Sequence, residues 1–278
     1  MAHKIYDNFY LSNEVEDMYK SRLDLQQFCT VDNSLVGTPG MIRKVNRYTA
    51  TDGTEKLTMG NGNTKSIEVS YAQKDYTIQL AQNKFEYYDE QDMTDPMLVP
   101  TGMQKMGIDL FNTVNADVFA EFNKAPSSQT VTATAENFGT FDNFADAVAL
   151  LNIEGTDNDP AQVAPLAFAF VNPKDLAKIR KALKDELKYV EAFVRTGYVG
   201  TVAGVNLFAK KDAVAGTIVG GTRAAVTLFN KRGVEVEQAV RSADDANIRL
   251  NTIFARKYYL AALTDETKSF KITTAPGG

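Results

Sequence analysis

The stretch Asn46-Arg-Tyr-Thr-Ala-Thr-Asp-Gly-Thr-Glu-Lys-Leu-Thr-Met-Gly-Asn-Gly-Asn-Thr-Lys-Ser66 is long and polar. Its only apolar residues are Tyr48, Ala50, Leu57 and Met59, which are too few to form a core. A lone hairpin is only marginally stable in water. We therefore expect this stretch to become ordered by contact with another surface, which is a first indication of assembly.

The sequence on both sides of this stretch predicts strands. Before it, apolar residues fall at Ile42, Val45 and Tyr48. After it, residues with strand-like alternation are Ile67, Val69, Tyr71, Tyr76, Ile78 and Leu80. Asp52-Gly53 and Asn61-Gly62 are turn signals. Residues 41–88 are thus expected to form one extended β-hairpin.

A long helix is predicted next. Apolar residues spaced three or four apart mark its buried face, namely Met103, Met106, Leu110, Val114, Val118 and Phe122. The helix is expected over 101–123. Acidic residues in 84–95 precede it, and we interpret them as charge that complements a helix N-terminus rather than as a catalytic carboxylate cluster.

The second half of the chain mixes helix and strand, so the fold class is α+β. The apolar run Leu166–Val171 predicts a strand buried on both faces. Asn172-Pro173 then provides a capping residue and a proline at the first helical position. A turn is expected at Lys231–Gly233 and a polar loop over 241–247, followed by a long strand from Ile248 and a last strand at 269–274.

The glycine-rich segment 197–211, GYVGTVAGVNLFAKK, could cradle a phosphate. Its spacing, however, matches neither G-x-x-x-x-G-K-[ST] nor G-x-G-x-x-G. The run Val205–Ala209 after the last glycine favours a strand, not the helix that a phosphate loop requires. We therefore predict a glycine turn leading into a strand.

The composition excludes several classes of function. The chain has 278 residues and a formal net charge of −5, which does not favour binding a polyanion. The only cysteine is Cys29, expected to be a small buried apolar residue, and the only histidine is His3. These two residues cannot supply a Ser–His–Asp triad or a multi-histidine metal site. We predict no enzyme activity, no cofactor, no metal and no membrane segment.

The order of these parts resembles the major capsid protein of tailed bacteriophages, whose fold is shared with encapsulins and the herpesvirus capsid floor domain. The polar hairpin, the long helix and the segments AFAFVNPKDLAKIRKALKD (167–185), TVAGVNLFAKK (201–211) and NIRLNTIFARKYYLAALTDETKSFKIT (247–273) carry the resemblance. In 201–211, Asn206 stands where the family usually has proline.

The resemblance implies a division of the chain into five parts. They are an N-terminal arm (1–40), an extended β-hairpin loop (41–88), a peripheral domain with the long spine helix (89–137), an axial domain (138–233) and the return strands of the peripheral domain (234–278).

The resemblance also implies a function. The chain would form pentamers and hexamers of an icosahedral phage head that encloses double-stranded DNA without sequence-specific binding. It would be assembled in the bacterial cytoplasm and become part of the virion. The implied partners are further copies of itself, a separate scaffolding protein and a portal protein. A decoration protein is an optional further partner. A fused scaffolding segment is not expected before Met1.

Inter-subunit contacts are expected in the hairpin, through Tyr48, Leu57 and Met59 together with Lys56 and Lys65. Some relatives crosslink lysine to asparagine between subunits, but Lys56 and Lys65 are more simply interpreted as solvated charges. The alternative function is an encapsulin-type shell around a cargo enzyme. An α/β enzyme is the third hypothesis, and it lacks an intact site in the sequence.

Overall fold

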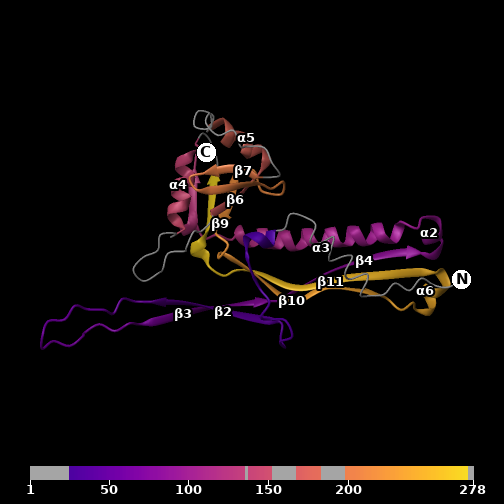
Figure 1. The fold of residues 1–278 in the computed structure, drawn as a ribbon, viewed down its shortest axis with the longest axis horizontal. Helices are drawn as coiled ribbons and strands as arrows, with labels where there is room; N and C mark the ends of the chain where they lie inside the picture. The colour runs from indigo at the N-terminus through magenta and orange to yellow at the C-terminus, as the bar shows by residue number, and fades with distance from the viewer. Residues whose placement is uncertain (1–24, 135–136, 152–166, 183–197, 275–278) are drawn as a thin grey trace.

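The computed structural model describes residues 25–134, 137–151, 167–182 and 198–274. In this part of the chain the strands form two sheets and a separate hairpin (Figure 1). A four-stranded sheet has the order β1-β10-β11-β4, and a six-stranded sheet has the order β5-β12-β9-β6-β8-β7. The hairpin, β2–β3, projects away from both sheets.

The four-stranded sheet and a long helix form one elongated layer pair. Its strands are β1 (Thr30–Asp32), β4 (Gln79–Tyr88), β10 (Val226–Gln238) and β11 (Leu250–Leu263). The helix α3 (Leu98–Phe122) runs along one face of the sheet, and the short helices α2 (Asp89–Thr94) and α6 (Ala243–Ile248) lie at the far end (Figure 1).

The α3 helix confirms the predicted long helix and begins three residues earlier than expected, before Pro100. Proline is accommodated there because the N–H groups of the first turn have no intrahelical partner. The predicted apolar face is buried: Val114, Val118 and Phe122 have no exposed surface. At Gly102 the helix passes so close to β4 that an added Cβ would lie 2.6 Å from the Phe85 ring.

The six-stranded sheet forms a second lobe with helices on its sides (Figure 1). Its strands are β5 (Thr130–Ala133), β6 (Ala167–Val171), β7 (Tyr198–Val202), β8 (Val205–Ala209), β9 (Thr217–Gly221) and β12 (Ser269–Thr274). The helices are α4 (Phe141–Leu150) and α5 (Pro173–Ala182). All of β6 is buried, as the sequence predicts. Asn172 Oδ1 accepts a hydrogen bond from Lys174 N at 2.9 Å, which confirms the predicted helix start.

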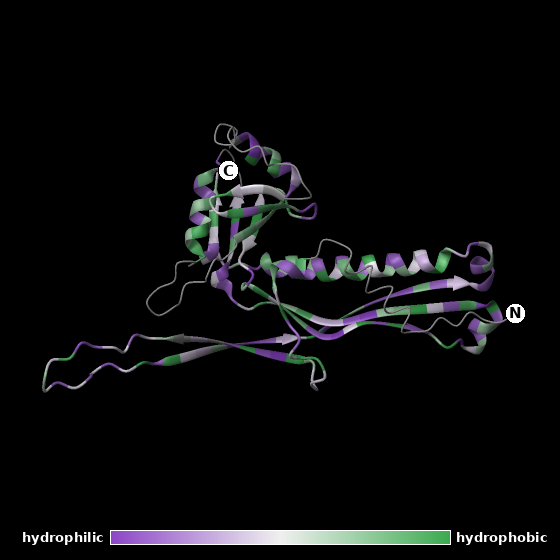
Figure 2. Ribbon diagram, viewed as in Figure 1, coloured by the Kyte–Doolittle hydropathy of each residue, from purple (hydrophilic) through white to green (hydrophobic). Residues whose placement is uncertain are grey.

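One apolar core joins the two lobes. It combines Phe122 of α3 and Leu228 of β10 with Phe168 and Phe170 of β6. The 3-10 helix η1 (Leu25–Phe28) adds Phe28, whose ring packs 4.9 Å from that of Phe168 between centroids. Cys29 is buried in the same core, as predicted for a small apolar residue. Figure 2 shows apolar residues concentrated in these lobes and a largely polar hairpin.

The glycine-rich segment forms a tight hairpin, not a phosphate loop. Strands β7 and β8 pair antiparallel, and Ala203 and Gly204 connect them with φ angles of 48° and 80°. Glycine is favoured at such positive angles because it has no Cβ. The predicted turn and strand are therefore confirmed in the part of this segment that the structure describes.

Three strand assignments differ from the sequence prediction. Residues 79–88 pair with β11, so the hairpin itself is confined to β2 (Ile42–Ala50), β3 (Val69–Thr77) and their connection. The chain does not turn at Lys231–Gly233, because β10 continues through this segment with two register shifts against β11. The last strand, β12, pairs with β5 and β9 in the second lobe, not with the strands of the elongated sheet.

Two local predictions were also wrong. The polar segment 241–247 is not all loop: Ser242 caps the short helix α6 by accepting a hydrogen bond from Asp245 N at 3.1 Å. Asp52-Gly53 does not form a turn. The chain runs on past it beside the other branch of the hairpin, so closely that a Cβ on Gly53 would lie 2.7 Å from the backbone nitrogen of Ile67. The strands of the hairpin instead reverse near Gly60, which has a φ angle of 92°.

Candidate assembly surface

The far half of the hairpin carries an exposed apolar face. Tyr48 pairs with Tyr71, and Ala50 pairs with Val69, so these four side chains share one side of the two-stranded sheet. Tyr48 and Tyr71 are 65% and 66% exposed, with ring centroids 6.1 Å apart. We call these four residues the hairpin face. Two adjacent tyrosines held in place but left in solvent are typical of a contact surface.

The structure places the predicted contact residues in two groups. Tyr48 belongs to the hairpin face, whereas Lys56, Leu57, Met59 and Lys65 all lie exposed in the connection 51–68, called the tip from here on. The hairpin face also includes Val69 and Tyr71, which the sequence analysis assigned only to a strand. Their alternation with polar neighbours is a signal in the sequence, whereas their position opposite Tyr48 is known only from the register of the structure.

Polar contacts link the two branches of the tip. Glu55 accepts hydrogen bonds from the backbone N–H and the hydroxyl of Thr64, each at 2.9 Å. The Thr64 N–H is the main cause that holds the pKa of Glu55 below its usual range. Asn63 donates to the Gly53 carbonyl at 3.1 Å. The tip therefore keeps an extended shape without an apolar core.

The base of the hairpin is fixed to the body through the opposite face. Tyr76 donates a hydrogen bond to the Leu263 carbonyl at 3.1 Å, and Lys74 forms an ion pair with Glu266. Val45 and Tyr76 pack against a small core around Phe229. Burial there raises the pKa of Tyr76. The two faces thus differ in role: near the base one contacts the body, while the other is open.

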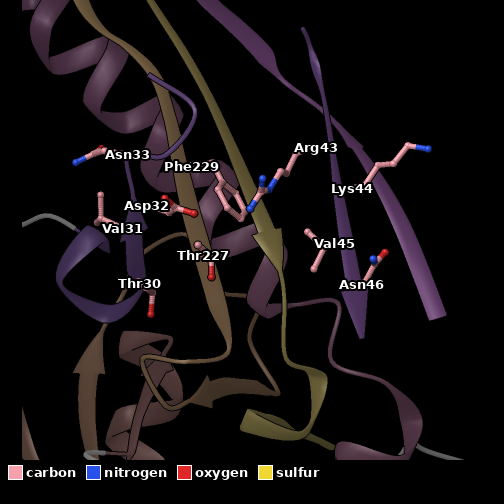
Figure 3. Close-up of a pocket in the computed structure, with 10 residues that line it drawn as sticks. All are labelled: Thr30, Val31, Asp32, Asn33, Arg43, Lys44, Val45, Asn46, Thr227 and Phe229. Atoms are coloured by element: carbon pink, nitrogen blue, oxygen red, sulfur yellow. The ribbon is translucent and has the colours of Figure 1, made fainter. Parts of the chain in front are cut away.

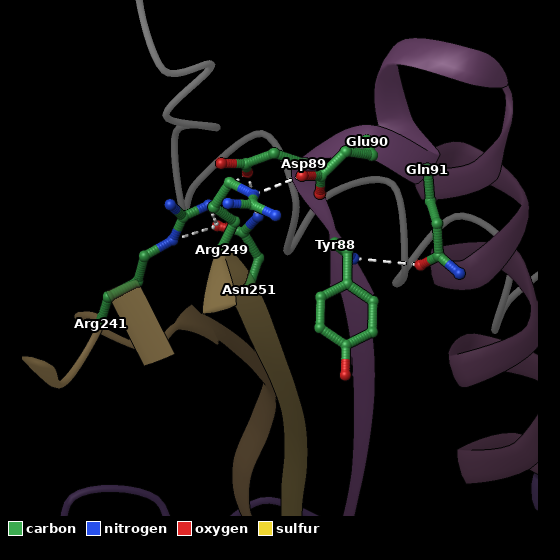
Figure 4. Close-up of polar contacts among 7 residues, drawn as sticks. All are labelled: Tyr88, Asp89, Glu90, Gln91, Arg241, Arg249 and Asn251. Atoms are coloured by element: carbon green, nitrogen blue, oxygen red, sulfur yellow. Dashed lines mark hydrogen bonds and ion pairs between the residues drawn. The ribbon is translucent and has the colours of Figure 1, made fainter. Parts of the chain in front are cut away.

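A polar cluster holds the far end of the elongated layer (Figure 4). Asp89, in the first turn of α2, accepts hydrogen bonds from Arg241 and from Asn251 Nδ2, the latter at 2.8 Å. Arg249 forms an ion pair with Glu90. The predicted charge at the start of the long helix is therefore wrong, since the first turn of α3 has no acidic residue. Asp89 and Glu90 instead lie in the first turn of α2 and bind arginines.

A cleft of about 510 Å³ lies between β1, β10 and the base of β2 (Figure 3). Asp32, Thr227 and Phe229 line one side of it, and residues 43–46 line the other. The pKa of Asp32 is lowered, mainly because its carboxylate accepts the Ser34 N–H at 2.7 Å. The guanidinium of Arg43 lies 5.4 Å from the centre of the Phe229 ring.

The described residues show no constellation for metal chemistry: no group of three or more histidine, cysteine or carboxylate side chains could hold an ion. Of the helices in the described ranges, none is long and apolar enough to cross a membrane. His3 lies outside the described residues. The surface features that stand out are therefore the hairpin face, the tip and the cleft.

The fold is the capsid fold found in tailed bacteriophages and encapsulins. Over 90% of this chain and 87% of the other, the structure matches the capsid of cyanophage P-SCSP1u with a TM-score of 0.67 at 13% identity. The capsid of bacteriophage PhiM1 matches over 100% and 90% of the two chains, with a TM-score of 0.65 at 12% identity. The SrpI encapsulin of Synechococcus elongatus matches over 98% and 91%, with a TM-score of 0.63 at 11% identity.

One relative found by sequence similarity is also named as a capsid protein. A major capsid protein of Staphylococcus phage phiMR11 is 29% identical over 112 residues, which is 39% of this chain and 39% of that protein. No protein-family model matches the sequence. The predicted fold is thus confirmed, and the named relative is a phage coat protein.

Proposed function

We propose that this protein is the major capsid protein of a tailed bacteriophage, assembling as pentamers and hexamers into an icosahedral shell around double-stranded DNA. The observation that carries the proposal is the hairpin. In a chain with the capsid fold, this hairpin has no core of its own and presents an exposed pair of tyrosines. A second copy that covers this face would bury aromatic surface, which stabilises interfaces strongly.

The proposal extends to the parts of the chain and to its partners. Residues 1–40 act as an arm, and the hairpin within 41–88 acts as the extended loop. The peripheral domain is 89–137 with α3, the axial domain is 138–233, and 234–278 return to the peripheral domain. Three strands depart from these bounds, because β5 and β12 join the second lobe and β10 begins in the elongated sheet at Val226. The chain works without a catalytic site, with a scaffolding protein and a portal protein, and assembles in the host cytoplasm.

The first test removes most of the tip together with the last two residues of β2. Deletion of residues 49–64 should leave a soluble, folded protomer, because the deleted segment contributes no residue to the described cores. Closed shells should no longer form when the variant is co-expressed with its scaffold, as seen by negative-stain electron microscopy. Normal shells from this variant would rule out the role given to the hairpin.

A finer test changes side chains only. Tyr48→Ser with Tyr71→Ser removes the aromatic pair, and Asn46→Ser with Gln73→Ser changes the adjacent cross-strand pair on the same face. We expect the tyrosine variant to lose most of its shells, while the matched control assembles normally. Neither variant should shift the thermal unfolding midpoint by more than about 2 °C, because exposed side chains contribute little to stability.

An encapsulin-type shell is the second candidate, since an encapsulin matches the fold with a TM-score of 0.63, close to the values for phage capsids. The contents of the particle separate the two. Shells from the natural source should contain double-stranded DNA for a phage head and a cargo enzyme for an encapsulin. Neighbouring portal and terminase genes would support the phage head.

A further inference from the structure

The cleft beside the base of β2 has an unused strand edge as one wall. Within the described residues β2 pairs with β3 alone, so its other edge has no strand partner. Residues 43–46 line the cleft along this edge as four consecutive positions. Such an edge presents N–H and C=O groups that can pair with an added strand.

The other wall of the cleft is a face of the four-stranded sheet. Thr30 pairs with Thr227 and Asp32 with Phe229, which places these side chains beneath the free edge of β2. Figure 3 shows Arg43 and Val45 pointing toward this face and Lys44 pointing away from it. A strand added to β2 would therefore lie on a polar surface with one aromatic ring.

Arg43 lies within electrostatic reach of Asp32, which also lines the cleft, but its side chain keeps one N–H without an acceptor. Its Nε is buried, and no acceptor within the described residues reaches it. A buried guanidinium N–H without an acceptor is costly and is best satisfied by a carboxylate. Basic residues on an edge can simply discourage strand pairing, and Lys44 fits that role because it is exposed and points to solvent. Arg43, turned inward, does not.

We propose that this cleft is a docking site for one extended segment of another protein, which adds a strand to β2 and places a carboxylate on Arg43. This inference concerns a partner site that the assembly role of the hairpin does not require.

Within the described residues, a second copy of the chain offers no good occupant. Among the described residues, the extended segment that could pair with β2 because it is not already a strand of a sheet is the tip, 51–68. Its two halves already bond to each other, and the carboxylate of Glu55 is held by Thr64.

Synthetic peptides test the site directly. The first is an eight-residue fluorescent peptide in which valine and threonine alternate around one central glutamate. The second has glutamine in place of glutamate, and the third is the glutamate peptide with alternate amides N-methylated, which prevents strand pairing. With the full chain, fluorescence anisotropy should give about tenfold tighter binding for the glutamate than for the glutamine peptide, and no binding for the methylated one.

Paired variants assign the effect to Arg43. Arg43→Gln should abolish the preference for glutamate, and Arg43→Lys should reduce it. Lys84→Gln, which removes a charge on β4 outside the cleft, should leave it unchanged. Binding should also slow amide hydrogen exchange in residues 43–46, a readout that does not depend on the variants. The proposal is overturned if no peptide binds, if the glutamate and glutamine peptides bind equally, or if protection appears on another strand edge.

A disulfide test distinguishes the source of the occupant. Asn46→Cys lines the cleft, and Met59→Cys marks the tip. In assembled shells these two cysteines should not form a disulfide between copies. A disulfide between them would assign the cleft to a second copy and overturn the proposal.

Discussion

At Gly102 the absence of a side chain decides how closely α3 lies on β4. An added Cβ would meet three atoms of the Phe85 ring at 2.6–2.8 Å. Overfilling this contact should cost about 1–3 kcal/mol, and the higher helix propensity of alanine should return up to about 1 kcal/mol. Gly102→Ala should therefore destabilise the protein by up to about 2 kcal/mol. Urea unfolding followed by circular dichroism measures this change.

A matched control exists at Gly233, where an added Cβ meets nothing within 4 Å and the backbone φ is not positive. Gly233→Ala should change the free energy of unfolding by less than about 0.5 kcal/mol. An equal decrease in the free energy of unfolding in the two variants would show that the close approach at Gly102 does not affect stability.

Tyr76 gives a second prediction for a single residue. Tyr76→Phe removes the hydrogen bond to the Leu263 carbonyl and should cost about 1 kcal/mol at pH 8. Because burial raises the pKa of Tyr76, folding favours the neutral phenol. This contribution is complete below the ordinary tyrosine pKa of about 10 and is lost as pH rises through the higher pKa of the folded protein.

Urea unfolding of wild type and Tyr76→Phe at pH 8 and at pH 11 tests the direction of this pH dependence. The stability difference between the two proteins should shrink at the higher pH. Tyr71→Phe is the control, because Tyr71 is exposed and its hydroxyl can be solvated. A difference that grows with pH would contradict the prediction.

Among the elements, the tip shows how a segment without a core stays extended. The lowered pKa of Glu55 means that folding favours the carboxylate. The contacts with Thr64 should therefore persist above the ordinary glutamate pKa of about 4.3 and be lost as pH falls through the lower pKa of the folded protein.

The amide proton of Thr64 reports on this contact in a nuclear magnetic resonance titration. Its chemical shift should change with a midpoint below about 4.3, the ordinary glutamate value. In Glu55→Gln the same proton should show no such step. A midpoint at or above the ordinary value would mean that the carboxylate does not hold the tip.

Elements with a strong local signal could be predicted from the sequence, and elements set by distant pairing could not. The apolar spacing of α3 and the fully apolar β6 were both identified. The sequence predicts β4 as part of the hairpin, because the alternation of apolar and polar residues indicates a strand but not which strand it pairs with. Its pairing with β11, more than 160 residues away, depends on the tertiary fold. Likewise, the register shifts that carry β10 past Gly233 leave no local signal.

For the whole molecule, the shared core and the isolated hairpin predict two levels of stability. The core that includes Phe122, Phe168 and Leu228 spans both lobes, so they should unfold in one cooperative transition. The hairpin lacks such a core, and its strands should open locally. Amide hydrogen exchange by mass spectrometry should show residues 42–50 and 69–77 exchanging at least about 100-fold faster than 253–262.

Global urea unfolding provides the comparison for that measurement. Exchange from 253–262 should give a free energy equal to that of unfolding, whereas exchange from the hairpin should give a much smaller one. Equal protection in the two regions would contradict the separation of the hairpin from the body.

The candidate surface was partly predictable for the same physical reasons. Tyr48, Leu57 and Met59 could be identified because apolar residues in a polar stretch stand out. The partnership of Tyr48 with Tyr71 required the cross-strand register, which a sequence does not specify. The cleft required the packing of β1 and β2 against β10, which lies more than 170 residues further along the chain.

The narrow attachment of the hairpin has a mechanical consequence. Strand β2 has nine residues, or about 30 Å at roughly 3.3 Å per residue, and the body holds it mainly near one end. A rotation of about 10° at that end would carry the other end sideways by about 5 Å over this length. A few side chains around Tyr76 therefore act as a pivot. Through it, identical chains could meet their neighbours at the different angles that a closed, curved surface requires.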